Sequence, residues 1–189
     1  MNLPGDSKPN PNSENSGNHL IGDLVKLRIW TAEDAPRLTA LLQAREIRDT
    51  NPFMPRNLSA NQICAAIENE ILAPEHQVSF RWAIEPHGLK EVVGCVSLDV
   101  YNDSRGEIGF WIGVPYWRRG YASEAARLVV KFGFESANCS AIEARALERN
   151  HASIRVLEKL GFQLDGALKD MEVYGRIRET IVMFKLLPK

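Results

Sequence analysis

The sequence has few of the features that mark secreted, membrane-spanning or nucleic-acid-binding proteins. Its three cysteines, Cys64, Cys95 and Cys139, are far apart and odd in number, so neither a disulfide framework nor a zinc site is indicated. No apolar run approaches the roughly 20 residues that cross a bilayer, and the N-terminus lacks a basic segment followed by an apolar one. The formal net charge of −1 excludes the usual basic excess of nucleic-acid-binding proteins. These absences predict a cytoplasmic protein that binds no metal, membrane or nucleic acid.

The composition separates a short tail from one folded domain. Residues 1–22 are rich in Asn, Pro, Ser and Gly, and they offer too little aliphatic surface to offset the entropy lost on ordering. The remaining residues, 23–189, form a segment long enough to bury one hydrophobic core. We therefore expect a disordered tail over residues 1–22 and a single domain over residues 23–189.

Hydrophobic periodicity predicts seven strands and about four helices. The expected strands are Val25–Trp30, Gln77–Glu85, Glu91–Val100, a strand from Glu107, Ala141–Leu147, Gln163–Leu168 and Ile177–Leu187. The expected helices run from Glu33 or Asp34 to about Arg45, from a capping box at Ser59 and Gln62 to before Pro74, from about Gly120, and over Ala152–Leu160. Hairpins precede a strand–helix–strand–helix–strand segment. This order predicts an α+β fold, in which a mixed, mostly antiparallel sheet lies between helices in three αβα layers.

The stretch from Val114 to Ala126 has the features of a phosphate-binding turn. It follows an apolar strand pattern and leads into a helical one. The first N–H groups of a helix have no internal partner and carry partial positive charge. Arg118 and Arg119 add positive charge, and Gly120 allows close approach to the backbone. We expect a diphosphate-bearing cofactor, although no Rossmann or P-loop glycine motif is present.

The strand from Glu107 alternates between two kinds of face. One face carries Ile108, Phe110, Ile112 and Val114, and the other carries Glu107, Gly109, Trp111 and Gly113. Bare backbone at two glycines beside a carboxylate suits a cleft that a ligand approaches closely. The alternative is a β-bulge, with Glu107 as a solvated strand end.

Four stretches together resemble the GNAT acyl-CoA N-acetyltransferases, and within them the RimJ/RimL-like branch of ribosomal-protein N-terminal acetyltransferases. They are Leu27-Arg-Ile-Trp-Thr-Ala-Glu-Asp34, Gly106-Glu-Ile-Gly-Phe-Trp-Ile112, Tyr116-Trp-Arg-Arg-Gly-Tyr-Ala-Ser-Glu-Ala125 and Asn150-His-Ala-Ser-Ile-Arg-Val-Leu-Glu-Lys-Leu-Gly-Phe162. Their order and spacing extend the resemblance over nearly all of residues 24–187. The phosphate loop of the family follows the pattern Gln/Arg-x-x-Gly-x-Gly/Ala. This chain departs from it at the first position, which is Trp117.

The resemblance implies the GNAT fold, with acetyl-CoA as co-substrate in a V-shaped opening between the strand from Glu107 and Ala141–Leu147. Backbone near Ile112 would meet the pantetheine arm, and the loop around Gly120 would hold the pyrophosphate. The cofactor-binding residues that it implies are Ile112, Gly113, Val114, Arg118, Arg119, Gly120, Tyr121, Ala122, Asn150 and Ser153.

The expected reaction is direct attack of a neutral amine on the thioester. An α-amino group with a pKa near 8 is roughly one-tenth neutral at pH 7, whereas a lysine is far less so. Glu107 is the candidate base, acting through one water. A backbone N–H near Ile112 would polarise the carbonyl oxygen, and most of the rate would come from positioning.

The leaving thiolate needs a proton or a hydrogen-bond donor. Many members of the family use a tyrosine seven residues after the asparagine, a position that Leu157 occupies here. Ser153 is the natural substitute and matches the serine of the branch. The alternative is that Ser153 is only a residue of the helix N-terminus, because Asn150 already caps the helix. Tyr174 is a weaker candidate.

The acceptor side is expected to include Ala44–Leu58 and Asp165–Arg178, whose acidic residues suit an amine. The acceptor would be a ribosomal protein N-terminus, another peptide or a small amine, and the branch allows a homodimer. The alternative function is a non-catalytic acyl-CoA-binding regulator or partner protein. The absence of the tyrosine and the presence of Trp117 at the first position of the phosphate loop favour that alternative. Glu107 together with Ser153 favours the enzyme.

Overall fold

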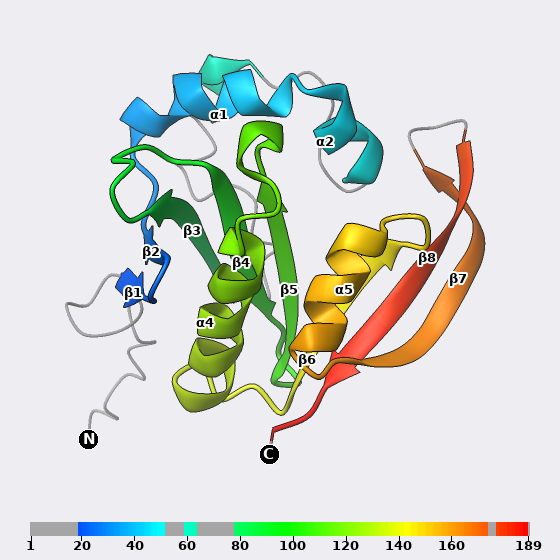
Figure 1. Ribbon diagram of the computed structural model, residues 1–189. Coiled ribbons are helices and arrows are strands. Elements are labelled where there is room, and N and C mark those ends of the chain that lie inside the picture. Colours follow the sequence, from blue (N-terminus) through cyan, green and yellow to red (C-terminus); the bar gives the residue numbers. More distant parts are fainter. Residues whose placement is uncertain (1–18, 52–58, 64–77, 174–176, 189) are drawn as a thin grey trace, which may run out of the picture.

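A computed structural model describes residues 19–51, 59–63, 78–173 and 177–188. Eight strands form one sheet in the order β1-β2-β3-β4-β5-β6-β8-β7 (Figure 1). Their bounds are β1 His19–Ile21, β2 Val25–Arg28, β3 Val78–Pro86, β4 Gly94–Val100, β5 Arg105–Ile112, β6 Ala141–Leu147, β7 Gln163–Val173 and β8 Ile177–Leu186. Neighbouring strands pair antiparallel except β5 and β6, which run parallel. The predicted mixed, mostly antiparallel sheet is confirmed, with eight strands rather than seven.

The eighth strand lies within the segment predicted as a tail. Residues 19–21 of β1 pair with residues 26–28 of β2, and Leu20 packs against the main core. The predicted tail boundary at residue 22 was therefore wrong for these residues. The polar and glycine-rich residues around them do not predict a strand. Pairing with β2 stabilises this short strand. Residues 1–18 lie outside the described residues, so their assignment as a tail stays a prediction.

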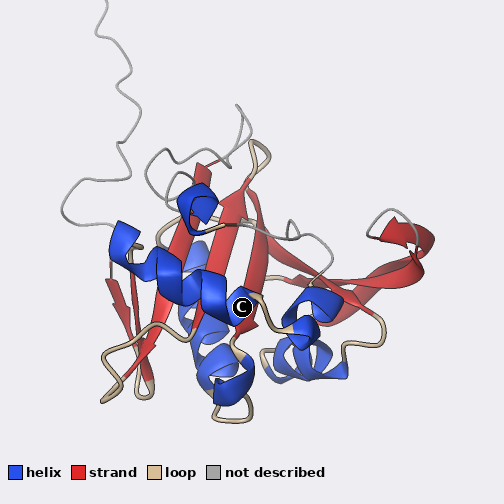
Figure 2. Ribbon diagram, turned by 90° about the horizontal axis from the view of Figure 1, so that it is seen from above, coloured by secondary structure: helices blue, strands red, loops and turns tan. Residues whose placement is uncertain are grey.

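Two helices cover one face of the sheet, α4 (Tyr121–Glu135) and α5 (His151–Lys159) (Figures 1 and 2). Both begin within one residue of the predicted start. Ala125, Val129 and Phe132 of α4 have the predicted helical spacing and are buried against the strands. The Phe132 ring meets Phe80 and Trp82 edge-on, with centroids 4.9 and 5.3 Å away. This aromatic cluster fixes α4 on the sheet.

The predicted helix from Glu33 or Asp34 to about Arg45 is broken into three pieces. They are a 3-10 turn at Ala32–Asp34, α1 at Ala35–Leu42 and α2 at Arg45–Thr50. Pro36 lies in the first turn of α1, as predicted. α1 packs in a second cluster with Trp30 and Trp111. Because Trp111 alternates with the core residue Ile112 on β5, α1 lies on the face opposite α4.

The capping box at Ser59 is confirmed. The Ser59 N–H donates to Oε1 of Gln62 at 2.9 Å, and the Gln62 N–H donates to Oγ of Ser59 at 3.3 Å. Residues 60–63 are helical, and the rest of the predicted helix lies outside the described residues. Within the described ranges, no helix is long and apolar enough to cross a membrane.

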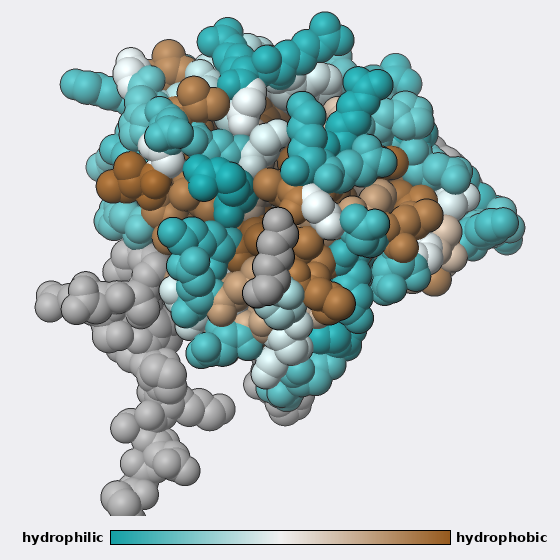
Figure 3. Space-filling view, turned by 60° about the horizontal axis from the view of Figure 1, so that its bottom comes forward, coloured by the Kyte–Doolittle hydropathy of each residue, from teal (hydrophilic) through white to brown (hydrophobic). Residues whose placement is uncertain are grey.

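The long edge strand β7 exposes apolar side chains, including Leu164, Leu168 and Met171. Hydrophobic residues on the face shown in Figure 3 form patches among hydrophilic ones. Charged residues such as Asp165 and Lys169 interrupt the apolar positions of β7, and charges on an edge strand hinder pairing with another chain. The homodimer therefore stays a prediction.

Candidate active site

The sheet opens between β5 and β6. Their parallel ladder contains the pairs Arg105↔Ala141, Gly106↔Ile142 and Glu107↔Glu143. Both strands continue beyond Glu107 and Glu143, yet no further pair joins these described segments. Their outer edges stay paired, β5 with β4 and β6 with β8. An opening toward the carboxyl ends of strands is a common ligand-binding place, and it lies where the V-shaped opening was expected.

β5 contains no bulge against β4. Their register is continuous from Gly94↔Ile112 to Val100↔Gly106, so the bulge alternative is wrong. A Cβ atom at Gly109 would meet only Oγ of Ser97, at 3.1 Å, which leaves room on this face. A Cβ atom at Gly113 would lie 2.7 Å from the Leu41 side chain of α1. Helix packing therefore accounts for Gly113, and only Gly109 leaves backbone bare.

The end of β5 is fixed by Trp117. The strand stops at Ile112, two residues before its predicted end, and Val114–Tyr116 forms a 3-10 turn. Nε1–H of Trp117 donates to the Ile112 carbonyl at 2.6 Å, and its backbone N–H donates to the Val114 carbonyl at 3.2 Å. The residue that departs from the family pattern thus ties the phosphate loop to the strand. Sequence reasoning did not foresee this role of the indole.

The loop before α4 has two residues in the left-handed region, Arg118 with φ of +61° and Gly120 with φ of +84°. A non-glycine residue there costs on the order of 1 kcal/mol, and such strain gathers at functional sites. Gly120 is the N-cap of α4, and no side chain among the described residues caps this helix with a hydrogen bond. The first N–H groups of α4 therefore remain available to an anion. Arg118 and Arg119 are both exposed beside them.

A buried carboxylate holds the first turn of α4 in place. Glu124 accepts hydrogen bonds from the backbone N–H groups of Asp23, Leu24 and Val25 at 2.7, 2.6 and 2.9 Å. Hydrogen bonds to an ionised acceptor are stronger than neutral ones. They fasten the phosphate loop to the start of β2.

Tyr116 joins the phosphate loop to α1. Its hydroxyl donates to Oε1 of Glu91 at 2.6 Å and accepts from the Arg37 guanidinium. The hydrogen bond to Glu91, together with burial, raises the pKa of Tyr116. Arg37 and Arg119 lie over its ring, 5.6 and 5.8 Å from the centroid. No local sequence pattern predicts this cluster, because its residues come from three separate segments.

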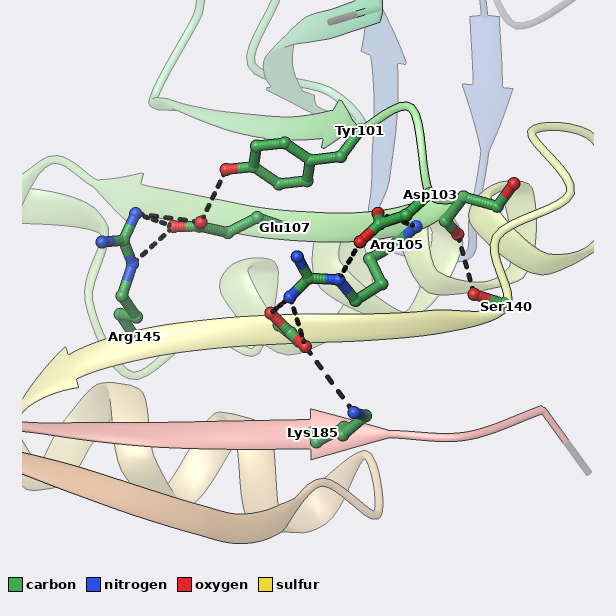
Figure 4. A network of polar contacts seen from close by, with 9 residues as sticks. Tyr101, Asp103, Arg105, Glu107, Ser140, Arg145 and Lys185 are labelled. Atoms are coloured by element: carbon green, nitrogen blue, oxygen red, sulfur yellow. Dashed lines mark hydrogen bonds and ion pairs between the residues drawn. The ribbon is translucent and has the colours of Figure 1, made fainter.

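Glu107 lies at the foot of the opening, at the last pair of the β5–β6 ladder (Figure 4). Nε and Nη2 of Arg145 donate to its Oε1 at 2.8 and 2.6 Å, and Nη2 also donates to Oε2 at 2.9 Å. The Tyr101 hydroxyl donates to Oε2 at 3.0 Å. Burial and the nearby Glu107 charge raise the pKa of Tyr101.

Glu107 is therefore a tightly bound anion, and the alternative of a solvated strand end is wrong. Sequence reasoning missed both of its partners. Strand alternation from Glu143 could have placed Arg145 on the same face of β6, because the two residues are two positions apart. Tyr101 carried no such signal, since it lies in the turn before β5.

Asn150 and Ser153 form a local hydrogen-bonded pair at the start of α5. Oδ1 of Asn150 accepts the Ser153 N–H at 3.2 Å, which confirms Asn150 as the helix cap. Nδ2 of Asn150 donates to Oγ of Ser153 at 2.9 Å and to the Thr50 carbonyl at 3.4 Å. Because Oγ of Ser153 accepts a hydrogen bond, its own proton points elsewhere. Contact of Asn150 with pantetheine stays a prediction.

Two carboxylates in or next to the predicted acceptor segments, Asp49 and Glu179, are paired with arginines. Asp49 lies 3.1 Å from Nε of Arg45, and Glu179 lies 2.8 Å from Nη2 of Arg149. These two paired carboxylates attract a cation less than unpaired ones would. Residues 52–58 of the predicted acceptor side and Tyr174 lie outside the described residues. The described residues contain no group of three His, Cys, Asp or Glu side chains that could hold a metal ion.

Comparisons with known proteins agree with this geometry. A family model described as an acetyltransferase (GNAT) domain matches residues 25–163. The uncharacterized N-acetyltransferase YoaA of Bacillus subtilis (strain 168) is 33% identical over 153 residues, which cover 79% of this chain and 85% of that protein. A GNAT-family acetyltransferase structure from Bacillus anthracis has a TM-score of 0.78 at 20% identity, covering 89% of this chain and 98% of that one. RimL, a ribosomal L7/L12 alpha-N-protein acetyltransferase in complex with coenzyme A, has a TM-score of 0.77 at 16% identity, covering 89% and 97%.

Proposed function

The chain belongs to the GNAT acetyltransferase family, and from this premise we propose that it transfers the acetyl group of acetyl-CoA to a primary amine. The family match confirms the predicted acyl-CoA-dependent N-acetyltransferase. The observation that carries the proposal is the opening between β5 and β6, together with the N-terminus of α4, the helix that follows β5 in the chain. The opening between β5 and β6 suits a thioester, and the N-terminus of α4 suits a pyrophosphate.

Acetyl-CoA is expected to place its pyrophosphate at the backbone of residues 119–122, beside Arg118. Its pantetheine arm would follow the end of β5 and the turn after it, along Ile112, Gly113 and Val114. Trp117 holds this turn through two carbonyl groups, so the binding surface is organised in advance. RimL, a protein of the same fold, is in complex with coenzyme A, which supports this cofactor.

The reaction forms a C–N bond and breaks a C–S bond. The amine nitrogen attacks the thioester carbon, and the coenzyme A thiolate leaves. The amine proton passes through one water to Glu107, because Arg145 and Tyr101 already occupy both carboxylate oxygens. The Ser153 hydroxyl, whose oxygen already accepts from Asn150, donates a hydrogen bond to the thiolate.

The acceptor that we propose is the N-terminal α-amine of a peptide. A polycation such as a polyamine would be attracted by unpaired carboxylates, yet Asp49, Glu107 and Glu179 are each paired with an arginine. An α-amine is also neutral far more often than a lysine at pH 7. The function in the name of RimL, α-N-protein acetylation, supports the same class.

The test is incubation of the purified protein with acetyl-CoA and a panel of amines, followed by measurement of product mass. The panel pairs peptides that bear ribosomal-protein N-termini with polyamines, aminoglycosides and free amino acids. One added acetyl group at a peptide α-amine is the expected result. Transfer only to polyamines would overturn the acceptor class. Binding of acetyl-CoA by calorimetry without transfer to any panel member would favour the regulator instead.

A further inference from the structure

Helix α2 is held by polar contacts at its C-terminal end. It has six residues, and Ile47 is its one buried side chain. Nη2 of Arg149 donates to the Asp49 carbonyl at 2.8 Å, and Nδ2 of Asn150 donates to the Thr50 carbonyl at 3.4 Å. Two consecutive residues of the turn between β6 and α5 thus bind the last two carbonyl groups of the helix. A cation at this end also suits the helix dipole.

The same arginine also binds β8, the strand beside β6 in the sheet. Nε of Arg149 donates to both carboxylate oxygens of Glu179 on β8, at 2.9 and 3.1 Å. The Glu179 side chain is 15% exposed, so water screens this pair only partly. One guanidinium therefore joins α2, the β6–α5 turn and β8, which are far apart in the sequence. Arginine suits this bridge because its planar fork serves several acceptors at once.

The contacts of Arg149 with Asp49 and Glu179, called the clamp here, adjoin the expected leaving-group site, because Arg149 directly precedes Asn150. Asn150, which holds Thr50, also donates to Oγ of Ser153. A shift of α2 would therefore disturb the hydrogen bond that orients the Ser153 hydroxyl. The phosphate loop before α4 is held by other residues, Glu124 and Tyr116. We therefore expect a shift of α2 to leave the position of this loop unchanged.

We propose that Arg149 is a positioning residue that holds the acceptor wall, defined here as Asp49 and Thr50 of α2 together with Glu179 of β8. Its kinetic consequence rests on the proposed function, because it concerns the amine and not acetyl-CoA. With the clamp intact, the wall is fixed before the acceptor arrives, and less binding energy is lost in ordering it. Without the clamp, the amine must order α2 as it binds.

The test compares Arg149→Ala with Arg105→Ala, a matched control. The Arg105 side chain is 45% exposed against 46% for Arg149, and it also has two partners, Asp103 and Glu143. Hydrogen–deuterium exchange at residues 45–50 is expected to become about tenfold faster in Arg149→Ala and to stay unchanged in Arg105→Ala. Exchange at this helix that matches the parent protein in both variants would overturn the proposal.

Kinetics with the amine acetylated in the panel provide the second readout. Arg149→Ala is expected to raise the KM for the amine about tenfold and to leave the KM for acetyl-CoA within about twofold. Arg149→Lys should recover part of the loss, since lysine keeps the charge but lacks the fork. A parallel rise in both KM values would overturn the proposal. If the parent acetylates no amine, the proposed function fails, and the exchange measurement still decides whether the clamp exists.

Discussion

The two sides of the opening are built in different ways. The cofactor side comes from one continuous stretch, from the end of β5 to the first turn of α4, and its expected ligand groups are mostly backbone N–H. The acceptor side comes from α2, the β6–α5 turn and β8, and arginine side chains join these segments. A continuous backbone site can be read from a local pattern. A site made of distant side chains depends on the whole fold.

This difference predicts how the two sides respond to substitution. Backbone geometry should control coenzyme A affinity, whereas side-chain chemistry should control turnover and acceptor use. Glu107 lies where the sides meet, at the last pair of the β5–β6 ladder.

The largest effect is expected for Glu107→Gln. The amide can still accept from Arg145, so the strands should stay joined, but it cannot take a proton. We expect kcat to fall about 100-fold at saturating acetyl-CoA, with little change in coenzyme A affinity. Steady-state kinetics with the panel amine and calorimetry with coenzyme A measure the two quantities.

Glu143→Gln is the matched control. Glu143 is the register partner of Glu107 on β6, and it is also ion-paired, with Arg105 at 3.0 Å and Lys185 at 3.7 Å. The Glu143→Gln variant should have nearly the same kcat as the parent protein. Equal turnover by Glu107→Gln and the parent would show that the base assignment is wrong.

A tenfold effect on the cofactor side is expected for Gly120→Ala. The left-handed φ of +84° disfavours any side chain, and the new Cβ would lie 3.1 Å from Leu24. Alanine in this conformation costs about 1–2 kcal/mol of conformational free energy. The loop would shift to relieve this strain and would bind coenzyme A about tenfold more weakly. Calorimetric titration with coenzyme A measures this change.

Gly88→Ala separates backbone strain from ligand binding. Gly88 lies in the β3–β4 turn with the same φ of +84°, and a Cβ atom there would meet nothing within 4 Å. Both variants should lose about 1 kcal/mol of unfolding free energy, yet only Gly120→Ala should lose affinity. Equal affinities would mean that the loop backbone does not hold the cofactor.

The features that the sequence predicted well are local ones. The start of α4 after Gly120, the bounds of β6 and the Asn150 cap each depend on residues close together in the chain. The Ser59 capping box is of the same kind. Local hydrogen bonding and periodicity determine such features before tertiary contacts form.

The features that the sequence did not predict require distant partners. The Arg145 and Tyr101 contacts of Glu107 depend on how β5 meets β6. The reach of Arg149 to Asp49 spans 100 residues of sequence. Periodicity shows which face a side chain occupies, but it does not show which residue of another segment lies opposite.

A smaller effect, about fivefold on coenzyme A affinity, is expected when Arg118 and Arg119 are both replaced by alanine. Both side chains are exposed, so each charge contributes modestly, and salt should weaken the difference between variant and parent. The control replaces Lys131 of α4 and Lys159 of α5, two exposed cations in later turns of their helices. Titrations at low and high salt measure the effect. A loss of the same size in the control would indicate general charge attraction and not a phosphate site.

The smallest effect, about threefold on kcat, is expected for Ser153→Ala. One hydrogen bond to the thiolate is removed, while the Ser153 N–H still reaches Asn150 and keeps the helix capped. Ser140→Ala is the control, because its hydroxyl makes one exposed hydrogen bond, to the Ser104 carbonyl at 3.2 Å. An unchanged kcat in Ser153→Ala would mean that the Ser153 hydroxyl does not act on the thiolate and that this serine is only a residue of the first turn of α5. A fall in kcat without a change in coenzyme A affinity would show that a side chain outside the continuous cofactor stretch acts on the leaving group.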